Sequence, residues 1–363
     1  MSNNNNMSEN RTTPKNRNIR NGQRSRTRRK KRKINYKSLC KYITFTLVFS
    51  VITAPLTLLY GPFENAKKMF VGTAMDSMNY KWLATTFLSQ EKIDEILTSN
   101  DSIDYVTNVM TTKDDSFIEI SPKKDNSIEL KQISDENDKF KGYALIIDDP
   151  SRVKVGVSSK IFKEGESVSQ IAENYDAVAA INGGYFTQKP GEEEHMSNGA
   201  IPTGFLMSEG KIIQDIDRDK EEYIVAITKE GRMLIGQTTV KELLAKKEND
   251  KDTVTEAISY TTTLIKNGKE VPIEKDEGSS PKTMIGQRQN GQIVMVVLDS
   301  NFPGGRLCAT VEEARTVMKN LGCYNAAKLD GGKSTTMYLN GEVINNPSYP
   351  LGERRISAGF IVK

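Results

Sequence analysis

Histidine and cysteine are scarce in this sequence, which has one His and three Cys among 363 residues. Three cysteines cannot build the disulfide scaffold of a small secreted domain. One histidine and the two later cysteines, Cys308 and Cys323, argue against a His/Cys zinc site. A serine-hydrolase triad would need His195, yet the sequence has no Gly-x-Ser-x-Gly elbow. Pairing of the two cysteines and contact of His195 with a substrate both stay open.

Acidic residues are almost missing from the first 41 positions, which hold 14 Lys/Arg and a single acid, Glu9, for a net charge of +13. The rest of the chain carries a net charge of −9. Nucleic-acid binding by the main part of the chain therefore loses its support. We expect residues 1–41 to form a disordered basic tail that faces lipid, with a nucleic-acid-binding tail as the alternative.

Charge is also missing from residues 42–63, a run of 22 positions that predicts a transmembrane signal anchor. About 20 apolar residues cross a hydrocarbon core of about 30 Å. The run is longer than the apolar region of a cleaved signal peptide and lacks its Ala-x-Ala pattern. Because the basic residues precede it, we expect the N-terminus in the cytoplasm and the larger part outside the cell. A buried helix of a soluble domain is the alternative.

Two patterns follow this run. Apolar residues recur at helical spacing between Glu64 and about Asn100 and predict a helical stalk, or a helix pair broken near Asn79. The polar residues 111–139 predict a linker that contains one or two short strands, so that stalk and linker fill residues 64–139. Residues 140–363 alternate short apolar runs with turn signals and predict one α+β (mixed α/β) domain, sheet-rich with packed helices. The expected strands are 143–147, 153–157, 177–181, 223–228, 293–298 and 356–362, and the expected helices are 167–175 and 311–321.

One apolar run stops at Asn182-Gly183-Gly184. Paired glycines let the backbone approach a ligand closely, and the Asn amide offers both a donor and an acceptor. A hairpin turn is the alternative, since Asn-Gly is a common turn dipeptide. The sequence alone does not decide between a binding loop and a turn.

Two further apolar runs end in an acid. Asp330 is followed by a loop whose backbone N–H groups, hydroxyls and lysine can meet an anion, although a capped turn with solvated side chains is the alternative. Asp299 leads into a Gly-rich loop with Arg306, and Arg354 precedes the final strand. Strand ends hold catalytic acids firmly, and arginine binds phosphate in a bidentate manner. The loop after Asp330 contains Gly331, Gly332, Lys333 and Ser334.

Taken in order, these motifs resemble the phosphodiester glycosidase family over residues 140–363. The family usually has Arg at position 282 and a third Gly at position 333, where this chain has Lys. The matching residues are Ile181-Asn182-Gly183-Gly184-Tyr185-Phe186, Pro202-Thr203-Gly204-Phe205 with Gly210-Lys211, Pro281-Lys282-Thr283-Met284-Ile285-Gly286, Asp299, the helix after Thr310, Leu329-Asp330-Gly331-Gly332 with Ser334, and Gly352-Glu353-Arg354.

The resemblance implies hydrolysis of a sugar-1-phosphodiester, here in an envelope glycopolymer or exopolysaccharide. Under this hypothesis Asp330 and Asp299 are the catalytic carboxylates, and the predicted substrate-binding residues are Asn182, Gly183, Gly184, Lys282, Arg306, Gly331, Gly332, Lys333, Ser334 and Arg354. No cofactor or metal is expected, although carboxylates alone also suit Ca²⁺. The alternative is a non-catalytic module that binds phosphate-containing glycopolymers during their assembly.

Overall fold

The computed structural model describes residues 36–76, 80–97, 110–111, 117–120, 125–187, 198–245, 252–273, 278–302 and 307–363. His195, Arg306 and the predicted break near Asn79 lie outside the described residues. The chain divides into two compact units, residues 1–56 and 57–363.

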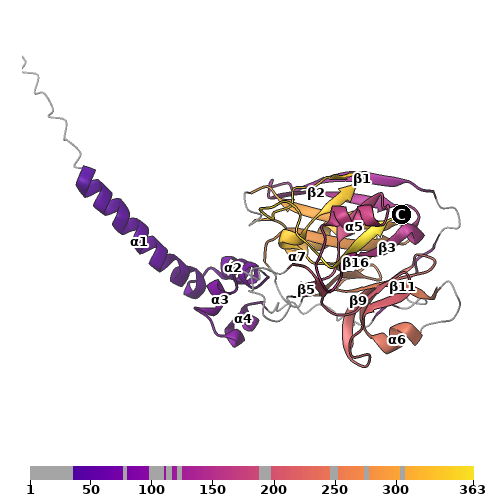
Figure 1. The fold of residues 1–363 in the computed structure, drawn as a ribbon. Coiled ribbons are helices and arrows are strands. Elements are labelled where there is room, and N and C mark those ends of the chain that lie inside the picture. The colour runs from indigo at the N-terminus through magenta and orange to yellow at the C-terminus, as the bar shows by residue number, and fades with distance from the viewer. Residues whose placement is uncertain are drawn as a thin grey trace, which may run out of the picture. The chain divides into compact units, whose positions relative to one another are not determined.

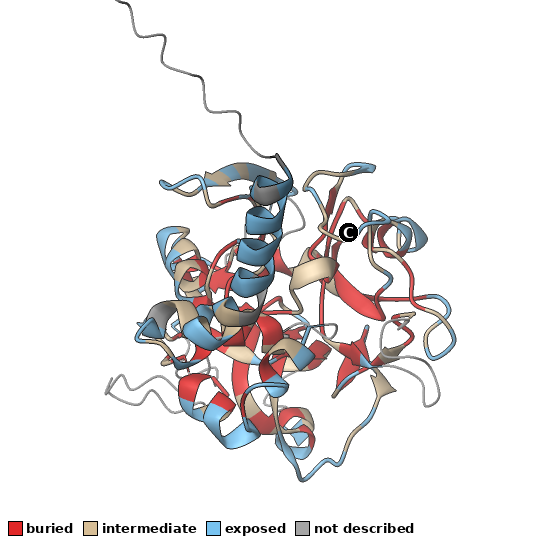
Figure 2. Cartoon of the chain, turned by 90° about the vertical axis from the view of Figure 1, so that its left-hand side faces the viewer, coloured by how far each residue is buried: buried red, intermediate tan, exposed pale blue. Residues whose placement is uncertain are grey.

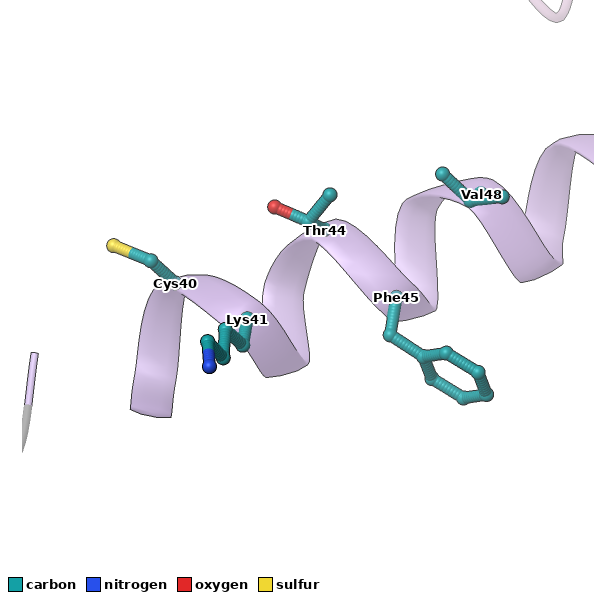
Figure 3. Close-up of a pocket in the computed structure, with 5 residues that line it drawn as sticks. All are labelled: Cys40, Lys41, Thr44, Phe45 and Val48. Atoms are coloured by element: carbon teal, nitrogen blue, oxygen red, sulfur yellow. The ribbon is translucent and has the colours of Figure 1, made fainter. Parts of the chain in front are cut away.

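Helix α1 (Tyr36–Tyr60) contains the predicted anchor and begins six residues before it. Its segment Leu39–Tyr60 is long and apolar enough to cross a membrane, with a mean hydropathy of 1.9. Thr46 and Thr53 donate their hydroxyls to carbonyls one turn back, which leaves the surface of the helix apolar. The side chains of Cys40, Lys41, Thr44, Phe45 and Val48 line a shallow concavity on α1 (Figure 3). Because one helix supplies all of them, we do not assign this concavity to catalysis.

Three helices follow: α2 (Glu64–Asp76), α3 (Trp82–Thr85) and α4 (Gln90–Leu97). They confirm the helical period seen in the sequence. Their buried side chains form a small core of their own, which includes Leu59 from the last turn of α1. The Thr73 hydroxyl accepts a hydrogen bond from Ser279 N (3.1 Å), which ties α2 to the sheet domain.

Three main sheets and one small one make up the rest (Figure 1). The seven-stranded sheet has the order β1 (Ile128–Ser134), β2 (Phe140–Ile147), β15 (Ile293–Ser300), β14 (Lys282–Arg288), β16 (Cys323–Lys328), β12 (Thr262–Lys266) and β13 (Lys269–Glu270). A five-stranded sheet has the order β10 (Met233–Thr239), β9 (Glu221–Thr228), β11 (Val254–Ser259), β7 (Leu206–Ser208) and β8 (Lys211–Gln214). A second has the order β18 (Glu342–Val343), β17 (Met337–Leu339), β4 (Ala179–Asn182), β19 (Ala358–Val362) and β3 (Val153–Val157), and β5 (Phe186–Thr187) pairs with β6 (Ile201–Pro202).

The three sheets share one apolar core. Alternate residues of their strands, such as Leu145, Val225 and Phe360, meet in a single buried cluster. Each sheet packs its other face against a helix: α7 (Val311–Asn320) covers the seven-stranded sheet, α6 (Val240–Ala245) the second and α5 (Val168–Asn174) the third. Figure 2 shows buried residues gathered in the interior and exposed residues on the outer helices and loops. This arrangement confirms the predicted mixed fold.

Local signals account for several of these elements. Ser167 and Thr310 cap α5 and α7 in reciprocal capping boxes with Gln170 and Glu313, where the sequence predicted both helices. The sequence predicts one or two short strands in the linker, and β1 is such a strand; the difference is that β1 pairs with β2 along its whole length and so belongs to the seven-stranded sheet. As an edge strand, β1 has one exposed face, so its apolar signal is weak. Cys308 and Cys323 are both buried and free.

Candidate functional site

Asp299 and Asp330 lie at the carboxyl ends of β15 and β16, on the same side of the seven-stranded sheet. Strands β15 and β16 both run antiparallel to β14, which lies between them, and Lys282 at the start of β14 pairs with Leu298. At about 4.8 Å per strand, the strand ends that carry the two acids are separated by roughly 10 Å. The structure therefore brings together residues that the sequence separates by about 30 positions.

The loop after Asp330 is fixed by its backbone. Asp330 N donates to the Gly183 carbonyl (3.0 Å), and Gly332 N donates to the Pro281 carbonyl (2.8 Å). Gly332 adopts a φ of +59°, which favours glycine. Because the Gly332 N–H already has a protein partner, it is not available to a phosphate in this conformation.

Asn182 is the hub that holds this loop. It is fully buried, its Nδ2 donates to the Asp330 carbonyl (2.7 Å), and its Oδ1 accepts from Thr283 Oγ1 (2.7 Å) and Thr336 N (3.1 Å). Strand β4, which ends at Asn182, pairs with β17 and β19 and not with β5, so Asn182-Gly183-Gly184 is not a hairpin turn. A Cβ on Gly183 would lie 2.9 Å from Gly359 Cα, so this crossing also needs glycine.

Asp299 is 2% exposed, and both of its oxygens accept hydrogen bonds. Oδ1 accepts from Asn345 Nδ2 (2.9 Å) and Oδ2 accepts from Asn346 N (2.8 Å). Asn345 Nδ2 also donates to the Thr335 carbonyl (3.2 Å). Asp299 is thereby linked through Asn345 to the loop that Asn182 holds from its other side. Burial raises the pKa of Asp299 above its ordinary value, partly offset by the two hydrogen bonds and by Lys141.

Strand alternation places the two acids on different faces of the sheet. Even-numbered buried residues of β14, β15 and β16 pack toward α7 and odd-numbered ones pack into the shared core, except for Cys323, which lies before the register shift in β16 and packs toward α7. Lys282, Lys328 and, by continuation, Asp330 belong to the first set, whereas Asp299 belongs to the second. Burial raises the pKa of the Cys308 thiol to about 12, and the charges of Lys282 and Asp299 act on it in opposite directions.

Two lysines beside Asp330 are almost fully buried. Lys282 and Lys328 are each 1% exposed. Lys282 Nζ donates to Ser280 Oγ (2.6 Å), and Lys328 Nζ donates to Tyr185 Oη (2.9 Å). Burying an ammonium group is costly, so two at one strand end indicate a site built for negative charge. No role was predicted for Lys328 or Tyr185, although Tyr185 lies in one of the matching motifs and Lys328 lies two residues before Asp330.

The segment between β18 and β19 contains Arg354, the last of the predicted substrate-binding residues. Ser348 Oγ donates to the Gly332 carbonyl (3.3 Å), and Ser169 N donates to Glu353 (3.0 Å). The Arg354 guanidinium lies over the Phe186 ring at 4.8 Å. The predicted role of Arg354 is supported by the nearness of its segment to Gly332, which Ser348 contacts.

Several hydroxyls of the loop have unused hydrogen-bonding capacity. Ser334, Thr335 and Thr336 are buried, and their hydroxyl oxygens have no partner among the described residues. Lys333 and Gly331 are partly exposed beside them. In the described part of the chain no group of three or more His, Cys, Asp or Glu side chains could hold a metal ion.

The raised pKa of Asp299 predicts a pH dependence of stability. The folded state holds the proton of this carboxyl more tightly than the unfolded state, so its contribution is present at low pH and is lost as pH rises through the folded pKa. We expect the unfolding free energy of the wild type, minus that of Asp299→Asn, to fall as pH increases above 3.8. Urea unfolding of both proteins across a pH series measures this difference; a flat or rising difference would contradict the assignment.

Comparison with known proteins identifies a family that matches about half of the chain. Residues 175–363 match the model of a family described as phosphodiester glycosidase. The catalytic domain of zebrafish N-acetylglucosamine-1-phosphodiester alpha-N-acetylglucosaminidase, auto-inhibited by its pro-peptide, has a similar fold: the TM-score is 0.52 at 20% identity, over 73% of this chain and 86% of that chain. A hypothetical protein from Synechocystis aligns with a TM-score of 0.46 at 15% identity, over 65% of this chain and 62% of that one. No curated protein matches the chain.

Proposed function

The chain belongs to the phosphodiester glycosidase family, and on this basis we propose that it hydrolyses the bond between the anomeric carbon of a sugar and a phosphodiester oxygen. The observation that carries the proposal for this chain is the sheet edge where Asp330 follows the buried Lys328 and lies beside the buried Lys282. A carboxylate at a strand end that also carries two buried ammonium groups can serve a reaction in which a phosphate departs with negative charge.

In the proposed reaction, water attacks the anomeric carbon and its oxygen forms the new bond to the sugar. The bond from that carbon to the phosphate oxygen breaks, and the phosphate leaves with the electron pair as a monoester. Asp330 accepts the water proton or stabilises the positive charge that develops on the sugar ring. Because a phosphate monoester is a far better leaving group than a sugar alkoxide, strong general-acid assistance is not required.

We assign phosphate binding to Lys282 and Lys328, with Lys333 and Arg354 as further cations. Lysine at 282 keeps the charge of the usual family arginine but lacks its planar fork, so this chain binds phosphate by charge more than by bidentate geometry. Ser334 supplies a hydroxyl at the loop. Gly183, Gly184 and Gly331 allow the backbones to approach closely around the sugar.

The environments of Asp299 and Asn182 favour positioning roles. Both polar atoms of the Asn182 amide are already hydrogen-bonded, one of them to the Asp330 carbonyl. Both Asp299 oxygens accept hydrogen bonds from Asn345 and Asn346, the segment that fixes the loop after Asp330. Direct participation of Asp299 in the chemistry, and of Asn182 in sugar binding, remains a prediction. Substitution of each residue distinguishes the two roles, because a positioning residue affects stability and activity together.

We propose an envelope glycopolymer or exopolysaccharide as the substrate and the outer face of the cell membrane as the location. The support is the apolar helix α1 and the basic residues that precede it. The test is to incubate the full chain in detergent with a glycopolymer that contains sugar-1-phosphate linkages. Equal amounts of reducing sugar and new phosphomonoester ends are expected. Saturable binding without release of either would instead favour the non-catalytic module.

Removing either buried lysine at the site should weaken catalysis. Lys282→Met and Lys328→Met are each expected to lower kcat/KM by about 10- to 100-fold, since a hydrogen bond to a charged group contributes about 1.5–3 kcal/mol. Lys266→Met is the matched control, because Lys266 is also buried but lies four residues from Thr262, about 13 Å along β12 from the site. Steady-state kinetics on a soluble sugar-1-phosphodiester measures the effect; equal losses in all three variants would contradict the assignment.

A further inference from the structure

We propose that the helices α2–α4 form a seat for the bilayer interface, with Trp82, Tyr60 and Phe63 inserted among the lipid headgroups. Half of the exposed large hydrophobic side chains described beyond residue 57 lie in the short segment between residues 60 and 87. Trp82 is 59% exposed, Tyr60 64% and Phe63 53%. This inference rests on the proposed membrane anchoring and adds a second contact with the membrane.

The exposed aromatics are not needed to fold the helices. The core of α2–α4 is made of aliphatic side chains such as Val71, Ile93 and Leu97, and it is complete without them. Large aromatic side chains left outside a core that does not use them mark an interaction surface.

The last turn of α1 is built into the same small unit. Leu59 is 2% exposed and belongs to its core, and Tyr60 Oη donates to the Phe87 carbonyl just after α3. Tyr60 is also the last residue of the segment long enough to span a bilayer. Tyr60 and Phe63 therefore lie at or within a few residues of the point where the chain would leave the hydrocarbon core, and Trp82 lies in α3, just before the Phe87 carbonyl that Tyr60 contacts.

The chemistry of the segment fits headgroups better than a protein partner. Trp and Tyr concentrate at the boundary between water and hydrocarbon, where one part of the ring is apolar and another forms hydrogen bonds. Tyr80, Lys81 and Trp82 are consecutive and all exposed, so an ammonium group able to meet lipid phosphate lies between two such rings. Because this surface continues directly from the membrane segment, we propose lipid as its binding partner. The experiment below distinguishes lipid from a protein partner.

Trp82 is the only tryptophan in the chain, so its fluorescence reports on this surface alone. The full chain is reconstituted into phosphatidylcholine vesicles, and flotation first establishes that it has inserted. Lipids brominated near the headgroup end of the acyl chain, lipids brominated near its methyl end, and aqueous acrylamide then serve as quenchers. We expect a blue-shifted emission that loses most of its intensity with headgroup-proximal bromines, loses less with deep bromines and is protected from acrylamide.

The matched control moves the single tryptophan to another exposed position. In the double variant Trp82→Phe with Phe162→Trp, the tryptophan replaces an exposed aromatic of the sheet domain, 43% exposed, and should be quenched by acrylamide but not by brominated lipid. The proposal would be overturned if Trp82 of the inserted protein were quenched by acrylamide but not by brominated lipid. Equal quenching of the tryptophans at positions 82 and 162 would also overturn it. So would a Trp82 that neither reagent quenches, which is the result expected for a protein partner. Failure of the chain to float with the vesicles would refute the anchor itself and, with it, the seat. Loss of glycosidase activity would leave this result untouched.

Discussion

Asp330→Asn is expected to lower the turnover of a sugar-1-phosphodiester by about 10²- to 10⁴-fold, the range in which positioned acids and bases contribute. The substitution removes the negative charge beside Lys282 and Lys328 but keeps the shape of the side chain. Its melting temperature should stay close to that of the wild type, because the backbone of Asp330 makes the contacts with Gly183 and Asn182. Release of reducing sugar and thermal unfolding are measured on the same preparation.

Asp176→Asn is the matched control for this experiment. Asp176 is exposed and precedes β4 at the end opposite Asn182, and its φ of +50° suits asparagine equally well. The control should retain full turnover although it undergoes the same change of charge. Undiminished turnover of Asp330→Asn would remove Asp330 from the reaction, and a large fall in its melting temperature would mean that the loss reflects unfolding.

The second large effect is expected at Asn182. Asn182→Ala leaves the Asp330 carbonyl, the Thr283 hydroxyl and the Thr336 N–H without their partner. A buried polar group without a partner costs about 1–3 kcal/mol, so we expect the unfolding free energy to fall by about 3–5 kcal/mol. Activity should fall by 10²-fold or more even where the variant is folded, since a displacement of about 1 Å in a catalytic group has that effect. Urea unfolding and kinetics at low temperature measure the two quantities.

Thr283→Val tests how much a single hydrogen bond of Asn182 contributes, compared with the loss of the whole Asn182 side chain. It removes one of the two hydrogen bonds that Asn182 Oδ1 accepts and leaves the bond to the Asp330 carbonyl in place. A loss of about 1 kcal/mol with most activity retained is expected. If Asn182→Ala were as stable as Thr283→Val but failed to bind substrate, the predicted contact of Asn182 with the sugar would be favoured over the positioning role.

Local chemistry explains why much of the fold could be predicted from the sequence. The capping hydroxyls Ser167 and Thr310 mark the starts of α5 and α7, and the expected strand at 153–157 coincides with β3. Strands buried on both faces, such as β15, are continuous apolar runs, and the sequence identifies them as such. Strand β1 has no such run, so the sequence predicts a short strand in the linker there but not its pairing with β2.

The site was only partly predictable, because its residues come together through strand order. The sequence identified Asp299 and Asp330 as acids at strand ends, but it did not reveal that β14 lies between their strands or that they leave the sheet on different faces. Asn345 carries no motif, yet it joins Asp299 to the loop after Asp330. Lys328 is the last residue of β16, and only its position two residues before Asp330 marks it in the sequence.

The central claim is that the bond between the anomeric carbon and oxygen breaks, and not a bond to phosphorus. Hydrolysis in heavy-oxygen water, followed by mass spectrometry of both products, tests it directly. We expect the heavy oxygen in the hemiacetal hydroxyl of the released sugar and none in the phosphomonoester. Heavy oxygen in the phosphate would show attack on phosphorus and would contradict the account.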